Sequence, residues 1–118
     1  MKVIIITTNN FRKEAKKLLK KYHSLKNELK EFSKALQKNP KLGIQITKNT
    51  FKIRLAVKSK GKGKSGGMRI ITYLYIKVHE KEELTQVYLL SIYDKSEFQN
   101  ISEKVLKELI KDIQNNLE

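Results

Sequence analysis

Cysteine and tryptophan are absent from this 118-residue sequence, and no long apolar run occurs in it. Without cysteine, disulfides, thiol catalysis and thiolate-bound zinc are excluded. The apolar run at residues 3–6 is shorter than ten residues and no small-residue cleavage site follows it, so it predicts a strand rather than a signal peptide or a membrane span. We therefore expect a cytoplasmic protein with no membrane partner.

Acidic residues are scarce relative to basic ones. The chain has 26 Lys and Arg against 12 Asp and Glu, which gives a formal net charge of +14. Phosphate neutralisation with release of counterions gives such a surface affinity for nucleic acid, whereas binding to a membrane surface needs an exposed apolar face as well. The charge therefore favours a nucleic-acid partner.

The single proline and the 39% of hydrophobic residues are typical of a folded chain rather than a disordered basic tail. Its length fits one domain, residues 1–118. Apolar periodicity predicts strands at 3–7, 51–57, 68–78 and 86–93, and helices at 11–22, 25–36 and 101–113. The fold class expected is α+β: a small antiparallel sheet of about four strands, covered on one side by an N-terminal helical hairpin and a C-terminal helix. Ser24 and Asn100 are expected to cap the second and third helices.

Seven cations and no acidic residue lie between positions 52 and 69. They are Lys52, Arg54, Lys58, Lys60, Lys62, Lys64 and Arg69. If the strands on either side of the glycine-rich segment 58–67 pair, Lys52 and Arg54 lie two residues apart on the polar strand face, with Arg69 near the same end. This arrangement predicts a phosphate-binding concavity, although solvated loop lysines explain Lys60, Lys62 and Lys64 equally well.

Other chemistries find little support. The stretch GKGKSGG lacks the spacing of a phosphate-binding P-loop and precedes a strand rather than a helix. His23 and His79 fall at separate turns, so we expect no metal site and no cofactor, and no Ser-His-carboxylate arrangement stands out. The basic faces of the first two helices fit a solvated surface better than a ribosomal RNA contact.

Two segments together resemble a known family. The stretch FKIRLAVKSKGKGKSGGMRIITYLYI, followed by VYLLSIYDKSE, is similar to the signature of RelE/HigB-type toxins of bacterial toxin-antitoxin pairs. It combines an F-K-I-R strand, a basic glycine-rich loop ending in GGxR, an aromatic strand and an L-x-x-Y-x-K-x-E ending. The helical hairpin with its NPKLG exit also looks like that family, so the resemblance extends over the whole chain.

The resemblance implies a metal-independent, ribosome-dependent endoribonuclease that cleaves mRNA by attack of a 2'-hydroxyl on the adjacent phosphate. By position, Lys52 takes part in activating the 2'-hydroxyl, Arg69 stabilises the transition state and Lys95 protonates the leaving oxygen. Arg54 stands where relatives have a second lysine. Because a guanidinium stays protonated, Arg54 is expected to bind phosphate instead.

The chain departs from the family at one point. A tyrosine that stacks on a base near the terminal helix has no equivalent, because Ile101 occupies that position; Tyr93 or Phe98 could substitute, and Tyr93 could equally be a core residue. The RNA-binding residues expected are Arg54, Lys58, Lys60, Lys62, Lys64, Tyr93 and Phe98.

The resemblance also implies partners: mRNA, the ribosome with its 16S rRNA, and a cognate acidic antitoxin that covers the cationic face or displaces the terminal helix. Two alternatives stay open. ParE-type toxins share the fold class but poison gyrase and cut no RNA, and a non-catalytic RNA- or ribosome-binding domain would carry the same charge.

Overall fold

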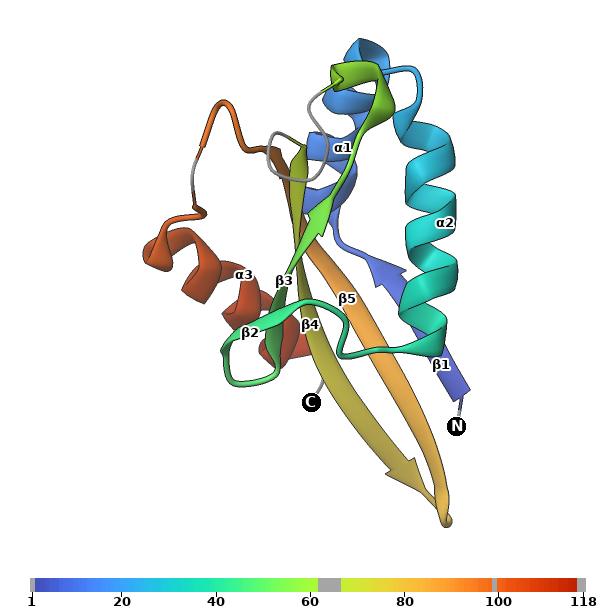
Figure 1. Cartoon of the computed structure of the whole chain (residues 1–118). Coiled ribbons are helices and arrows are strands. Elements are labelled where there is room, and N and C mark those ends of the chain that lie inside the picture. The colour runs from blue at the N-terminus through green and yellow to red at the C-terminus, as the bar shows by residue number, and fades with distance from the viewer. Residues whose placement is uncertain (1, 62–66, 99, 117–118) are drawn as a thin grey trace.

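A computed structural model describes residues 2–61, 67–98 and 100–116. In chain order the elements are β1 (Lys2–Thr7), α1 (Asn9–Lys21), α2 (Leu25–Lys38), β2 (Ile44–Thr47), β3 (Thr50–Leu55), the 3-10 turn η1 (Lys58–Lys60), β4 (Met68–His79), β5 (Glu82–Asp94) and α3 (Glu103–Asn116) (Figure 1). The α+β class is therefore confirmed.

The sheet has five strands in the order β1-β5-β4-β3-β2 and is mixed. β1 runs parallel to β5, whereas the other neighbours are antiparallel. The expectation of a four-stranded antiparallel sheet is wrong on both counts. The four residues of β2 are all exposed. Ile44 and Ile46 alternate with Gln45 and Thr47, but four residues are too short a pattern to predict a strand. β1 pairs with β5, which lies about 80 residues later in the chain, so its direction cannot be predicted from its own residues.

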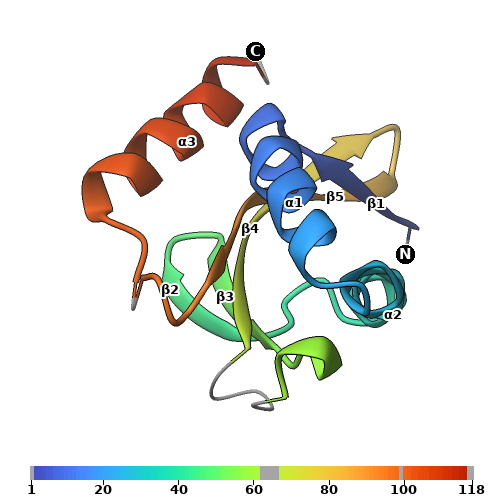
Figure 2. The same ribbon diagram turned by 90° about the horizontal axis from the view of Figure 1, so that it is seen from above.

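Helices cover both faces of the sheet, in contrast to the expected single layer. α1 and α2 pack on one face and α3 on the other (Figure 2). The side chains of β4 alternate accordingly: Met68, Ile70 and Leu74 lie in the core beneath α1 and α2, whereas Ile71 and Tyr73 lie beneath α3. A strand that is apolar on both faces needs cover on both faces, because an uncovered face would leave its apolar side chains exposed to water.

Polar side chains fasten α1 to β5. Thr8 caps α1 by accepting the backbone N–H of Phe11 at 3.1 Å, and its hydroxyl donates to the carbonyl of Leu89 at 2.8 Å. Ser24, in contrast, makes no capping bond; its hydroxyl donates to the Glu28 carboxylate at 2.9 Å and lies 2.8 Å from that of Ser59. The α1–α2 turn is therefore attached to the segment that follows β3.

A β-bulge in β5 determines which residues reach the α3 side. Ile71 lies opposite Ser91 and Thr72 opposite Leu89, so Leu90 is the additional residue. Because this extra residue reverses the alternation, Ile92 faces α1 and α2 while Tyr93 faces α3.

Glu14 of α1 supports the bulge. Its Oε1 accepts the Ser91 hydroxyl at 2.8 Å and the Ile92 N–H at 3.3 Å. Burial raises the pKa of this carboxyl, while these hydrogen bonds oppose the rise. The reversal of alternation is therefore held in place by a side chain from a different element.

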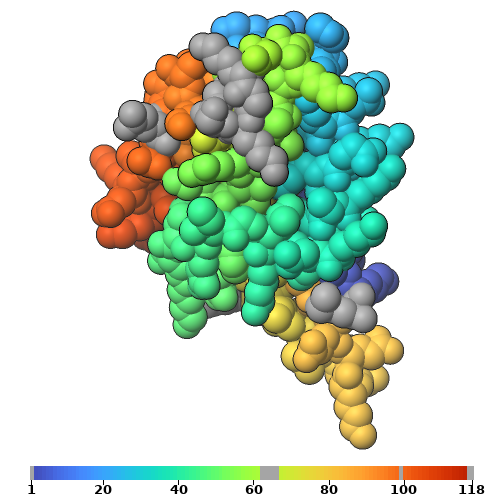
Figure 3. All heavy atoms as spheres, in the orientation of Figure 1, coloured from blue at the N-terminus to red at the C-terminus, as the bar shows by residue number. Residues whose placement is uncertain are grey.

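The β4–β5 hairpin projects beyond the rest of the sheet (Figures 1 and 3). Its turn lies at Glu80 and Lys81, whose φ values of 51° and 75° belong to the left-handed region used by tight hairpins. Ile76 and Val78 are exposed near this tip. In the described part of the chain, no helix combines the length and apolarity that crossing a membrane requires.

Candidate functional site

β3 and β4 bring three of the predicted site residues onto one face of the sheet. The two strands pair as expected, with Arg54 opposite Arg69 and Lys52 opposite Ile71. Phe51 and Ile53, which alternate with these cations, lie in the core beneath α1 and α2. Lys52, Arg54 and Arg69 consequently share the side that faces α3. We call this surface the cationic face.

Arg54, Arg69 and Tyr93 form one row across three strands. Arg69 lies directly opposite Arg54 on one side and Tyr93 on the other. Arg69 is only 3% exposed, whereas Arg54 is exposed. Burial and the charge of Arg54 lower the pKa of Arg69. Like charges directly opposite each other on a sheet are destabilising, so this pair favours an anion between them.

The partners of Arg69 fix its place in the strand. Its Nη1 donates to the carbonyl of Met68 at 3.1 Å. Burial raises the pKa of the Tyr93 hydroxyl, while the backbone N–H of Ile101 and the charge of Arg69 lower it. Arg69 is therefore close enough to Tyr93 to affect the ionisation of its hydroxyl.

Tyr93 and Phe98, the two expected base-stacking residues, contact each other. Their rings meet edge to face, with centroids 6.4 Å apart and an interplanar angle of 81°. Tyr93 is 5% exposed and belongs to the core cluster beneath α3, whereas Phe98 is 58% exposed. Phe98 is thus the ring that a ligand can reach, and Tyr93 supports it from below.

Lys52 connects the cationic face to the chain before α3. Its Nζ donates to the side-chain oxygen of Asn100 at 3.1 Å. Asn100 does not cap α3 as expected, since the backbone N–H of Val105 donates to the hydroxyl of Ser102 at 3.2 Å instead. The side chain of Asn100 therefore orients a candidate catalytic amine.

Lys95 lies where β5 ends, one residue beyond Asp94, and is half-buried. Its backbone N–H donates to the carbonyl of Gly67 at 3.2 Å. Gly67 precedes Arg69 by two residues, so the backbone of Lys95 lies beside the start of the strand that carries Arg69. Lys52 and Arg69 therefore lie on neighbouring strands, and the backbone of Lys95 lies just beyond β5 at the same end of the sheet.

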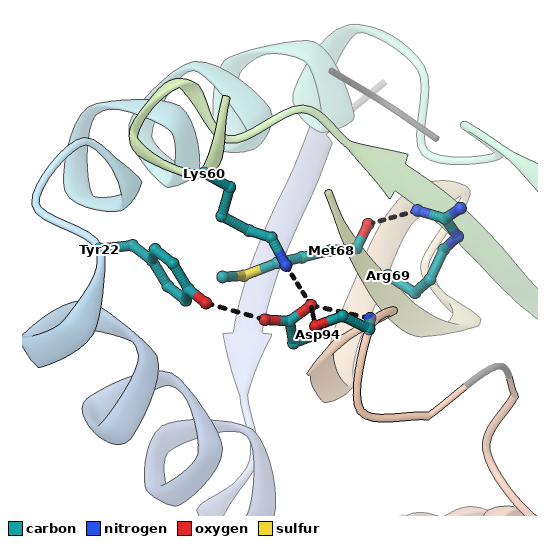
Figure 4. Close-up of polar contacts among 6 residues, drawn as sticks. Tyr22, Lys60, Met68, Arg69 and Asp94 are labelled. Atoms are coloured by element: carbon teal, nitrogen blue, oxygen red, sulfur yellow. Dashed lines mark hydrogen bonds and ion pairs between the residues drawn. The ribbon is translucent and has the colours of Figure 1, made fainter. Parts of the chain in front are cut away.

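Lys60 lies on the other side of the sheet and binds Asp94. The two side chains form an ion pair in which the lysine is 6% and the aspartate 1% exposed (Figure 4). The expectation that Lys60 binds RNA is therefore not supported, because its ammonium is buried against a carboxylate of the same chain. The side chain of Arg69 points away from this pair (Figure 4).

The remaining loop cations divide into two groups. Lys58 is exposed, and its backbone N–H donates to the Glu28 carboxylate at 2.6 Å, which leaves its side chain as a candidate ligand. Lys62 and Lys64 lie outside the described residues. Among the described residues the ion pairs are Lys34–Glu31 and Lys60–Asp94, so no carboxylate pairs with Lys52 or Arg54 there.

Neither histidine reaches the cationic face. His23 lies at the α1–α2 turn and His79 near the tip of the β4–β5 hairpin, and both are exposed. Within residues 2–61, 67–98 and 100–116, no group of three or more His, Cys, Asp or Glu is placed to hold a metal ion.

Sequence reasoning missed Asp94 and Asn100. A single acid at the end of an apolar strand, in the YDKSE stretch, was the available signal for Asp94. Asn100 carried no signal, because only the folded chain brings it to Lys52. The chain matches no model of a known protein family and no solved structure.

Proposed function

We propose that this protein is a RelE/HigB-type toxin, a metal-independent endoribonuclease that cleaves mRNA on the ribosome in the cytoplasm. The observation that carries the proposal is the row formed by Arg54 and Arg69, with Lys52 on the same face and Lys95 at the same end of the sheet. The sequence resemblance supplies the reaction type, and the site geometry supports it.

Arg54 and Arg69 bind the scissile phosphate in this proposal. Guanidinium groups donate in pairs to phosphate oxygens, and two of them from adjacent strands can bind both non-bridging oxygens. Negative charge accumulates on these oxygens as phosphorus becomes pentacovalent. Arg69 is 3% exposed before RNA binds, so in this proposal it stabilises that charge once RNA binding uncovers its guanidinium.

The two lysines transfer protons at either end of the reaction. The 2'-oxygen bonds to phosphorus as its proton passes to Lys52, the general base of this proposal. The bond from phosphorus to the 5'-oxygen breaks, and Lys95 donates a proton to that oxygen. The products are a 2',3'-cyclic phosphate and a 5'-hydroxyl, so atoms and charges balance without an added reactant.

The substrate and partners follow from the exposed groups. Phe98 stacks on a base next to the cleaved bond, and Lys58 contacts the sugar-phosphate backbone. A nuclease of this kind needs an acidic antitoxin that covers the cationic face in its own cell.

Induced expression followed by primer extension on a reporter message tests the proposal. We expect growth arrest with cuts in phase with codons. In purified translation reactions, Arg69→Ala should lower the cleavage rate by about 100-fold or more. Arg12→Ala, an exposed arginine on α1, is the matched control and should cleave as the wild type does.

Two outcomes would contradict the proposal. Arrest without message cleavage, persisting in Arg69→Ala, would indicate a gyrase-directed toxin. Ribosome binding without arrest or cleavage would indicate a non-catalytic RNA-binding domain.

A further inference from the structure

A buried carboxylate lies behind the cationic face. Asp94, the last residue of β5, is 1% exposed and points toward the end of α1 (Figure 4). Its Oδ1 accepts Lys60 Nζ together with the N–H and the hydroxyl of Ser96, the latter two at 2.9 and 2.8 Å. Its Oδ2 accepts the Tyr22 hydroxyl at 3.0 Å. We call Tyr22, Lys60, Asp94 and Ser96 the Asp94 cluster.

The cluster joins segments that are distant in sequence. Tyr22 follows α1, Lys60 ends η1 just before the glycine-rich stretch, and Ser96 lies in the turn after β5. Lys60 Nζ also lies 5.4 Å from the centroid of the Tyr22 ring, a cation–π contact. One carboxylate therefore fixes three parts of the chain relative to each other.

Stability alone gives a weak reason for this arrangement. Taking two charges out of water costs several kcal/mol, and apolar residues of similar volume often stabilise a core as well or better. The ion pair instead holds its two side chains in a defined relative position, because a charge-assisted hydrogen bond depends on geometry more strongly than an apolar contact does.

The groups that Asp94 holds in place are next to the proposed site. Asp94 lies opposite Met68, the residue before Arg69. On either side of it in sequence are Tyr93, which lies opposite Arg69, and Lys95, whose N–H donates to Gly67. Rotation or slippage of Asp94 would move Tyr93 and Lys95 relative to Arg69.

We propose that Asp94 is a positioning residue for RNA cleavage: through Lys60, Tyr22 and Ser96 it holds the end of β5 so that Lys95 and Tyr93 stay aligned with Arg69. This inference rests on the proposed nuclease function. Asp94 itself touches neither RNA nor the reacting atoms, because it faces the opposite side of the sheet from Arg69.

A charge-neutral double variant, Asp94→Asn with Lys60→Met, separates positioning from stability. Since it removes both buried charges together, it leaves no unpaired ion in the core, and its melting temperature should stay close to that of the wild type. The cleavage rate at saturating RNA should fall about tenfold to 100-fold, because small misplacements of reacting groups have effects of this size. The KM for RNA should stay within about twofold, since Arg54 and Lys52 are untouched.

Glu31→Gln with Lys34→Met is the matched control. This pair is the other lysine–carboxylate bridge described, but its side chains are 60–72% exposed and it lies on α2. We expect it to leave both the melting temperature and the cleavage rate unchanged.

Ser96→Ala provides a second route if the double variant does not fold. Ser96 is exposed, and its hydroxyl donates to Asp94 without contributing charge. Loss of this bond should loosen the turn that carries Lys95 and lower the rate about threefold to tenfold while folding is retained.

The results distinguish this inference from the proposed function. If the wild type and Arg69→Ala behave as expected but a folded double variant cleaves at the wild-type rate, Asp94 has only a structural role and the inference is wrong. A wild-type cleavage rate in Ser96→Ala would overturn it in the same way. Absence of cleavage by the wild-type protein would overturn the proposed function instead.

Discussion

Arg54 on β3 and Arg69 on β4 lie directly opposite each other, two like charges in one row of an antiparallel sheet. The chain places Phe51 and Ile53 on the other side of β3, so neither arginine can turn toward the α1–α2 core without displacing apolar groups. We expect a bound anion to relieve the repulsion between them, so that the like-charge pair lowers stability in the free protein and strengthens anion binding.

Replacement of Arg54 should therefore stabilise the folded protein while lowering its cleavage activity. Arg54→Gln should raise the free energy of unfolding by about 0.5 kcal/mol in low salt, because it removes a like-charge pair. The gain should shrink as salt screens the charges. Cleavage should fall, since a phosphate ligand is lost. Urea unfolding in low and high salt, with cleavage measured in parallel, checks both effects; a destabilised variant would show that Arg54 has a packing role instead.

Lys52 should contribute to the salt dependence of RNA binding. Lys52→Ala should reduce the slope of log K against log salt concentration by about 0.7 for single-stranded RNA, because one fewer counterion is released. Lys77→Ala is the matched control, an exposed lysine on the projecting part of β4, and its slope should equal that of the wild type. Fluorescence anisotropy with a labelled oligonucleotide measures the slopes. Equal slopes for the wild type and both variants would show that Lys52 does not contact RNA phosphate.

Asp94 should make folding sensitive to acid. Its hydrogen bonds to Lys60, Ser96 and Tyr22 outweigh the effect of burial and lower its pKa from 3.8 to about 2. A carboxylate with a lowered pKa stabilises the folded state fully above its unfolded pKa, and this stabilisation is lost as pH falls through the folded value.

Wild-type protein should accordingly lose about 2 kcal/mol more than Asp94→Asn between about pH 5 and pH 2. Denaturant unfolding at several pH values measures the free energy of unfolding of each protein. The other carboxylates are the same in both proteins, so their effects cancel in the difference. Parallel curves for the two proteins would mean that Asp94 is not held as the structure indicates.

Gly43 should tolerate no side chain. Its φ is +96°, and an added Cβ would lie 2.4 Å from the carbonyl oxygen of Lys52 and 2.7 Å from Cγ1 of Ile53. Gly43→Ala should cost about 3 kcal/mol and displace β3 at Lys52, because backbone strain and overpacking act together.

Gly61→Ala is the matched control for Gly43. It also has a positive φ, +72°, but no atom lies within 4 Å of the added Cβ. We expect a cost of about 1 kcal/mol from the backbone alone. Urea unfolding of both variants gives the comparison, and equal losses would show that the contact with β3 is unimportant.

Part of the fold follows from local patterns. The alternation of Phe51, Ile53 and Leu55 with Lys52 and Arg54 predicted β3 and its two faces, because a strand needs only period-two residues to define its sides. The helical periods of α1 and α2 likewise predicted the hairpin. Patterns of this kind depend on neighbours within a few residues, which the sequence displays directly.

Other parts depend on contacts that no local pattern encodes. The strand β2 has four residues, all exposed, so its alternation of Ile44 and Ile46 with polar residues is too short to predict a strand without β3 beside it. The bulge at Leu90 turns Tyr93 toward α3 only because Glu14, nearly 80 residues earlier in the chain, accepts the free N–H of Ile92. The burial of Lys60 likewise requires Asp94 and Tyr22 to meet it, so its appearance as one more loop lysine was misleading.

By itself the sequence determined the α+β class, the strongly basic charge and the polar face of β3 that carries Lys52 and Arg54, since these follow from composition and short-range periodicity. Tertiary structure alone decided that helices cover both faces, that β1 runs parallel to β5, and that Lys60 binds Asp94 rather than remaining in solvent. The physical reason is that the burial of a residue is not a property of that residue alone. Whether a cation is solvated or enclosed depends on which distant segments pack around it.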